Sequence, residues 1–362
     1  MKLRVVDMSR VLAGPVCSMV LGDLGADVIK VERPPLGDET RGWGPPFDSL
    51  GQSAYFLAVN RNKKSLAADL STEQDRSVVI ELIAGADVVL ENFLPGALPK
   101  LGIDAEKLLE NNPSLVWCTI TGFGADSSRP GYDFVIQAES GWMSITGEPE
   151  GSPMKVGVAL ADVVAGKDAA IAILAAIAER DAGTLATWRR RIVISLASSA
   201  VAALVNVAQN VLVSGKDAKR WGNAHANLVP YQLFDAADRP LVIAVGSDAQ
   251  WLRFTEALGI AELAADPTLR TNAGRIAARD RVVKAIAARV RAKSARHWID
   301  LLDAVGVPCG LVRSVSEALA GTGADALTGA PLSVPGTVRN PPPRLDEHGD
   351  AIRALGWRAF GS

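Results

Sequence analysis

The stretch that decides the fold runs from residue 3 to residue 32 and reads LRVVDMSRVLAGPVCSMVLGDLGADVIKVE. Its first six residues, 3–8, are a short apolar run that predicts a strand, and residues 27–32 predict a second strand. Residues 13–26 between them predict a helix, with Pro15 near its first turn and Gly25 at its end. A strand, a helix and a strand in this order form a βαβ unit, which builds parallel sheets covered by helices.

Three more strand signals follow the first unit, at residues 86–93, 115–124 and 191–197. Helical stretches separate them, so we predict an α/β fold in which residues 1–200 form a large domain with an open, Rossmann-like parallel sheet. Residues 199–216 are interpreted as one continuous helix. Residues 201–224 are interpreted as a linker, residues 225–325 as a smaller α/β domain, and residues 326–362 as a segment that returns to the large domain.

The overall composition excludes several classes of protein. The net charge is −2 and no long basic run occurs, which argues against a nucleic-acid-binding protein. The longest apolar run, residues 169–178, is too short to span a bilayer, and we expect neither a membrane segment nor a signal peptide. The three cysteines are widely separated, which predicts a cytoplasmic protein without disulfides and without a cysteine-rich metal site.

The best-known catalytic and nucleotide-binding motifs are missing from the sequence. No GxGxxG follows the first strand, and Walker A, GxSxG and HExxH sequences do not occur. The three histidines have no evident partners for a catalytic triad. The predicted fold class therefore leaves the function open.

Eight stretches taken together are more specific than any one of them. They are residues 5–41, 60–70, 86–103, 119–124, 131–141, 156–177, 222–231 and 306–319, and they follow one another along almost the whole chain. In content and order they resemble the class III (CaiB/BaiF-type) CoA-transferase family. The resemblance implies an enzyme that moves CoA between an acyl-CoA thioester and a free carboxylic acid.

Asp162 is a single acid at the point where an apolar segment turns into an alanine-rich helix. From the residues alone, this aspartate has an ordinary explanation as a helix N-cap, with the helix beginning near Val163. The resemblance implies instead that Asp162 is the catalytic nucleophile, and the two roles are compatible. Its carboxylate would form a mixed anhydride with the acyl group and then an aspartyl-CoA thioester. The same resemblance places Tyr132 and Asp133 close to the thioester.

The CoA-binding residues are implied by the resemblance, position by position. Arg33 corresponds to the residue that meets the adenine and ribose-phosphate end, and Lys100, with Leu101 beside it, falls where the family often has arginine. The predicted cofactor-binding residues are Val11, Arg33, Ala68, Leu70, Asn92, Phe93, Lys100 and Leu101. We expect CoA to be a substrate, with no tightly bound cofactor and no metal.

Two alternatives to a CoA-transferase remain open at this point. The first is a 2-methylacyl-CoA racemase, a related activity in which a histidine follows the glycine of the 131–141 stretch. Tyr132 occupies that position here, and a tyrosine with a pKa near 10 is poorly matched to proton abstraction at neutral pH. The second is a non-catalytic CoA-binding protein, against which the acid at position 162 argues.

The resemblance also implies an interlocked homodimer, with segments around residues 200–230 and 320–350 linking the two chains. No run of four glycines, which forms a mobile lid in some members, is present. His225 and Asn227 match a family signature, and we interpret them as turn residues rather than catalytic ones. The sequence does not identify the acids that are exchanged, although small dicarboxylates such as succinate are sensible first substrates to test.

Overall fold

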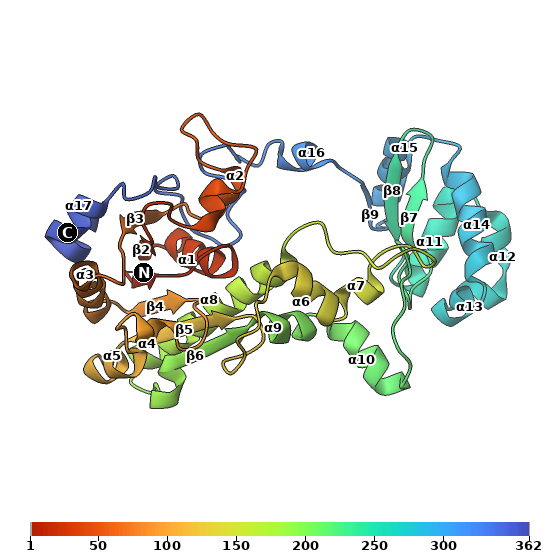
Figure 1. The fold of residues 1–362 in the computed structure, drawn as a ribbon. Helices are drawn as coiled ribbons and strands as arrows, with labels where there is room; N and C mark the ends of the chain where they lie inside the picture. Colours follow the sequence, from red (N-terminus) through yellow and green to blue (C-terminus); the bar gives the residue numbers. More distant parts are fainter. Residues whose placement is uncertain (1, 362) are drawn as a thin grey trace. The chain divides into compact units, whose positions relative to one another are not determined.

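The computed structural model describes residues 2–361, and these form two compact units. Among the described residues, the first unit comprises 2–143, 155–216 and 321–361, and the second comprises 144–154 and 217–320. The short segment 144–154 therefore groups with the second unit, although sequence neighbours on both sides of it belong to the first. Figure 1 shows the course of the chain.

A six-stranded parallel sheet forms the centre of the first unit. Its strands are β1 (Arg4–Asp7), β2 (Asp27–Glu32), β3 (Lys63–Ala67), β4 (Val88–Glu91), β5 (Val116–Thr121) and β6 (Arg191–Ser195). Their order in the sheet is β3-β2-β1-β4-β5-β6, and every neighbouring pair is parallel. The chain moves outward from β1 to β3 and then returns to place β4 on the other side of β1. The α/β fold with a Rossmann-like parallel sheet is thus confirmed, because this is the strand order of that fold.

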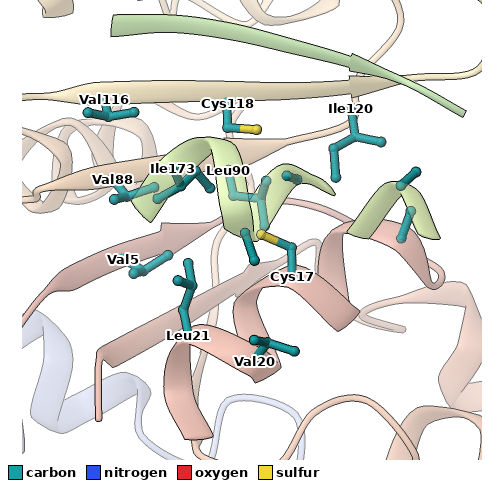
Figure 2. Packing of buried hydrophobic residues seen from close by; sticks show 14 of the residues in the cluster. Val5, Cys17, Val20, Leu21, Val88, Leu90, Val116, Cys118, Ile120 and Ile173 are labelled. Carbon is teal, nitrogen blue, oxygen red and sulfur yellow. The ribbon is translucent and has the colours of Figure 1, made fainter. Parts of the chain in front are cut away.

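The inner strands β1, β4 and β5 are buried on both faces of the sheet, which explains why most of their residues are apolar. Val5, Val88 and Val116 point to one face, where they pack with residues of α1 (Ala13–Asp23) and α8 (Leu160–Asp181). Figure 2 shows this core, with Cys17 and Cys118 inside it. The next residue along each strand points to the opposite face and packs under α3 (Glu73–Ala84) and α5 (Ala105–Asn111).

The remaining helical segments of the first unit are short. They are η1 (Glu39–Gly42), α2 (Ala54–Leu57), α4 (Ala97–Lys100), α6 (Asp133–Glu139), η2 (Thr187–Arg190), α9 (Leu196–Ala202), α10 (Val205–Ser214), α17 (Gly349–Leu355) and η4 (Gly356–Phe360), and α7 (Trp142–Ile145) crosses into the second unit. The C-terminal segment lies on the sheet's unit: the Arg61 guanidinium donates to the carbonyls of Thr328 and Ala330, at 2.8 and 2.6 Å.

The prediction of one continuous helix over residues 199–216 is wrong. The chain forms α9 and α10, which meet at an angle of 70°. The indole Nε1–H of Trp142 donates to the carbonyl of Ala200 at 2.8 Å and so takes the acceptor that would continue the helical ladder. Within residues 2–361, this bent pair is the only place where length and apolar composition would suit a membrane crossing, and no single helix qualifies.

The second unit contains an antiparallel sheet in the order β7-β8-β9 and a group of helices. Its elements are β7 (Tyr231–Asp235), β8 (Pro240–Ala244), α11 (Asp248–Leu258), α12 (Ala261–Ala265), η3 (Pro267–Arg270), α13 (Asn272–Ala277), α14 (Arg279–Val290), α15 (Ala295–Ala304), β9 (Cys309–Leu311) and α16 (Val315–Leu319). Its separate core includes Trp251, Phe254 and Trp298. The Nδ1 atom of His225 accepts the backbone N–H of Asn227 at 3.0 Å, a local hydrogen bond of the kind expected for these two residues.

Candidate active site

Two adjoining cavities open at the carboxyl ends of β1 and β4, where the strand order of the sheet reverses. Open α/β sheets bind their ligands in this crevice. The first, which we call the Arg33 cavity, has a volume of about 340 Å³, and the second, the Asp162 cavity, has about 270 Å³. Arg10 and Phe93 line both of them, so the two cavities share a wall.

The Asp162 cavity contains the acid that the sequence singles out. Asp162 lies in the first turn of α8, three residues after the N-cap Ala159, so the interpretation of Asp162 as the N-cap is wrong. The helix begins at Leu160, earlier than predicted. This placement leaves the carboxylate free of a capping role, while it stays close to the positive end of the helix dipole.

The surroundings of Asp162 make its carboxyl unusually basic for an aspartate. Burial and the nearby Asp133 carboxylate raise the pKa of Asp162 to about 7, although a hydrogen bond from the backbone N–H of Ala13 opposes this rise. Ala13 is the first residue of α1, so its N–H is one of those that a helix start leaves without a partner in the helix. Asp162 is therefore poised to ionise near neutral pH.

Asp133 supports the start of α8 from α6. One carboxylate oxygen accepts the backbone N–H of Ala161 at 2.8 Å, and the other accepts the Gln137 amide at 2.7 Å. Gln137 in turn accepts the backbone N–H of Val156 at 2.8 Å. Asp133 thus fastens the chain immediately before Asp162. Asp133 affects Asp162 through its hydrogen bond to the Ala161 backbone and through its negative charge, and it does not line either cavity.

Tyr132 lines the Asp162 cavity and directly follows the loop between Gly122 and Gly131, whose two ends are in backbone contact. The backbones of Gly122 and Gly131 touch there, and a Cβ on either residue would collide with the other. Tyr132 follows directly, lines the Asp162 cavity and is 60% exposed. The two glycines therefore fix where α6 begins and where Tyr132 and Asp133 lie.

The helices α1 and α8 approach each other most closely at Gly166. A Cβ there would lie 2.5 Å from the backbone oxygen of Ala13 and 3.1 Å from the Cβ of Val16. Gly166 is one turn of helix beyond Asp162, so this close approach is what brings Asp162 to the start of α1.

The predicted CoA-binding residues divide between the two cavities. Arg33, Ala68, Leu70 and Leu101 line the Arg33 cavity, Val11 and Asn92 line the Asp162 cavity, and Phe93 lines both. Lys100 lines neither cavity. It is exposed at the last position of α4, beside Leu101. The Asn92 side chain is already occupied, because its amide and carbonyl groups bond the backbone of Arg10 at 2.9 and 3.0 Å.

Several residues of the site were not found by sequence reasoning. Arg10 and Arg129 are the cations that line the Asp162 cavity in the described part of the chain. Burial and the negative charges of Asp162, Asp133 and Asp38 raise the pKa of Tyr55, which places this α2 residue near the acids. Lys30 and Asp38 lie in the wall of the Arg33 cavity, with both side chains closed off from solvent. One signal for these residues is present in the sequence: Lys30 is a lysine among the apolar residues of a buried strand, which indicates a buried acidic partner.

Comparison with known proteins shows the family of this chain. The family described as CoA-transferase family III matches residues 2–329. The chain belongs to this family. It is therefore a CoA-transferase, and the predicted family and class of activity are confirmed.

Individual relatives support the same assignment over most of the chain. It is 42% identical to the succinyl-CoA:glutarate CoA-transferase of Mus musculus, over 87% of this chain and 72% of the relative. It is 41% identical to the succinate–glutarate CoA-transferase of Agrobacterium fabrum, over 88% of this chain and 81% of the relative. A crystal structure of a CaiB/BaiF family protein from Brucella suis superposes with a TM-score of 0.84 at 41% identity, covering 97% of each chain.

Proposed function

We propose that Asp162 is the nucleophile of the transfer reaction. Its ionised carboxylate attacks the carbonyl carbon of an acyl-CoA, the carbon–sulfur bond breaks, and CoA leaves as the thiolate. The thiolate then attacks the aspartyl carbonyl of the mixed anhydride, releases the donor acid and forms an aspartyl-CoA thioester. The acceptor carboxylate attacks this thioester and expels the thiolate, which gives a second mixed anhydride. The thiolate then attacks the acceptor's carbonyl carbon in that anhydride, forms the new acyl-CoA and releases the Asp162 carboxylate. The observation that carries the proposal is a cavity in which one partly buried, unusually basic carboxylate meets the backbone N–H of Ala13 at the start of a helix.

The rate of enzyme acylation should depend on pH through Asp162. Only the ionised carboxylate attacks, and the pKa is raised to about 7, so kcat/KM should fall about tenfold per pH unit below that value. Asp133→Asn removes the neighbouring charge and keeps an oxygen for the Ala161 N–H. It should therefore lower the pKa of Asp162 and move the acid limb, the low-pH fall of the pH–rate profile, to lower pH. Steady-state rates of acyl-CoA product formation, measured between pH 5 and 9, give both profiles. A wild-type profile that stays flat down to pH 5 contradicts the proposal.

We propose that CoA lies across both cavities. Arg33 at the end of β2 would meet the phosphates, and Ala68 and Leu70 after β3 would offer an apolar surface to adenine. Phe93, which borders both cavities, would lie along the pantetheine arm that leads to Asp162. Lys100 would contribute through its charge at the rim. Acyl exchange changes no oxidation state, so the proposal includes no tightly bound cofactor or metal.

We propose that the exchanged acids are small dicarboxylates. The names of the two similar transferases include succinate or succinyl-CoA and glutarate. In this chain, Arg10 and Arg129 line the cavity of Asp162, where one carboxylate of the substrate would react and a cation could hold the other.

A matrix of acyl-CoA donors and free acids tests both the activity and the substrate class. Succinyl-CoA incubated with glutarate should give glutaryl-CoA and succinate, which chromatography of the CoA esters resolves. Monocarboxylates of equal length should react much more slowly. Exchange of the Cα hydrogen of a 2-methylacyl-CoA for deuterium, without any CoA transfer, would favour the racemase instead.

We propose that the protein is a homodimer in which the two chains interlock, and that it works in the cytoplasm. The support for the dimer is an exposed apolar surface: Val205, Leu212 and Val213 of α10 are 69, 76 and 77% exposed, and no residue of α10 is buried. Such a surface is typical of an interaction site. The support for the compartment is that Cys17, Cys118 and Cys309 are free thiols.

Charges placed on α10 should weaken the dimer. Two carboxylates in an apolar interface would be desolvated without partners, so chains synthesised with Leu212→Asp/Val213→Asp should fail to assemble and remain monomers. Leu36→Asp, at an apolar residue that is 80% exposed outside α10, is the matched control and should remain dimeric. Sedimentation velocity measures the state of all three proteins. A wild-type monomer, or a double variant that stays dimeric, contradicts this surface as the interface.

A further inference from the structure

A buried ion pair lies directly beneath the loop that joins β1 to α1. The Lys30 ammonium is 2.9 Å from a carboxylate oxygen of Asp38, and both side chains are fully inaccessible to solvent. Burial alone would lower the pKa of Lys30 and raise that of Asp38, but each charge reverses the effect on the other, so both groups are ionised. A buried pair of this kind often gives no more stability than apolar residues would. The role of this ion pair is therefore sought in the groups that Lys30 and Asp38 contact.

Both members of the pair bind the backbone of the β1–α1 loop. Lys30 donates to the carbonyl of Ser9 at 2.9 Å. The Asp38 carboxylate accepts the backbone N–H of Val11, with its two oxygens at 3.2 and 3.3 Å. The Asn92 side chain fixes Arg10 between them. Three consecutive loop residues are thus held by side chains from three other segments.

The loop needs this support because Val11 is strained. Its φ is +70°, in the left-handed region that a β-branched residue rarely adopts. A strained backbone conformation of this kind persists only where surrounding contacts hold it, and such conformations are often found at active sites. Two residues later, the N–H of Ala13 meets Asp162. The bend at Val11 is what turns the chain into α1 at that point.

We propose that Asp38, with Lys30, is a positioning residue for Asp162: the pair holds the Ser9–Leu12 loop so that the Ala13 N–H stays directed at the Asp162 carboxylate. This inference rests on the proposed role of Asp162. Asp38 itself touches neither the reacting atoms nor Asp162. The hydrogen bond favours the ionised, attacking form of Asp162, and it also gives a donor for the oxyanion that forms during each attack.

The direction in which the pKa of Asp162 changes separates this positioning role from a direct effect of the Asp38 charge. The charged groups around Asp162 are Asp133 on α6, and Arg10, Glu39 and Arg129 around the cavity, with the Tyr55 hydroxyl on α2. Removing the negative charge of Asp38 would leave the pKa of Asp162 unchanged or lower it. Losing the Ala13 hydrogen bond would raise it.

The test uses Asp38→Asn in the full-length enzyme, with Asp23→Asn as its matched control. Asp38 accepts from both Lys30 and Val11, so the amide nitrogen of asparagine, a donor, must face one of them and break that contact. Asp23 is also a buried acid paired with a buried cation, Arg61 at 2.7 Å, but it lies at the far end of α1 and does not contact the loop. The acid limb of the acylation rate should move up by about one pH unit in Asp38→Asn. The maximal rate should fall at least about tenfold, and the limb should not move in Asp23→Asn.

Further outcomes separate the two proposals. A limb that stays in place or moves down in Asp38→Asn, while Asp162→Ala is inactive, overturns the positioning role alone. An Asp162→Ala enzyme that still transfers CoA overturns the proposed nucleophile first. If Asp38→Asn folds poorly, Lys30→Gln/Asp38→Asn removes the unpaired buried charge. It should show the same upward shift, and an unshifted limb in that variant also overturns the proposal.

Discussion

Asp162→Ala is expected to lower the rate of CoA transfer by about 10⁴-fold or more. The variant lacks the group that forms both covalent intermediates, so a free acid would have to attack the thioester directly in one step. The residue is partly exposed at the cavity wall and is not needed to cap α8, so its removal should leave the fold intact.

Two measurements make this loss interpretable. Isothermal titration with CoA should give a dissociation constant close to that of the wild type, because the proposed CoA contacts lie mainly in the Arg33 cavity. Asp162→Asn keeps the size of the side chain and should be as inactive as the alanine variant when freshly prepared. A transfer rate within tenfold of the wild type in either variant would exclude Asp162 as the nucleophile.

Gly166→Ala is expected to reduce activity by about 10²-fold. In an ordinary helix this change is stabilising by about 1 kcal/mol. Here the added methyl would meet the Ala13 backbone oxygen at 2.5 Å, so α1 and α8 must move apart. The same movement separates Asp162 from the Ala13 N–H, and displacements of about 1 Å at a reacting group have effects of this size. Overpacking should also lower the free energy of unfolding by about 1–3 kcal/mol.

The control for this variant is Gly157→Ala, five residues before Asp162. An added Cβ at Gly157 would meet no atom within 4 Å, so its activity and melting temperature should match those of the wild type. Steady-state kinetics and thermal unfolding of the two variants provide the comparison. Wild-type activity in Gly166→Ala would show that the close approach of α1 to α8 does not position the site.

Most of the parallel sheet could be predicted, because every strand except β3 is a local apolar pattern. Residues 3–8 and 27–32 are apolar enough to be buried on both faces, and the helix between them has recognisable ends. The strand order places the segments after β1 and β4 side by side, and this explains why residues of the stretches 5–41 and 86–103 meet in one site.

The contacts that arise between distant segments could not be predicted. Nothing local to Asp38 shows that it would meet Lys30 and Val11, because that meeting depends on how a loop folds over the sheet end. The break between α9 and α10 likewise depends on Trp142, about 60 residues earlier in the chain. Within residues 199–216 the pattern is helical throughout, so the bend has no local signal.

The most direct test of the account is to find the covalent intermediate on Asp162. The enzyme should be mixed with succinyl-CoA, quenched in acid within one turnover, digested and analysed by mass spectrometry. We expect the peptide that contains Asp162 to carry one CoA in thioester linkage, and borohydride to reduce that aspartate to a homoserine. A turning-over enzyme whose Asp162 stays unmodified at every quench time, or which carries the CoA on another residue, would contradict the account.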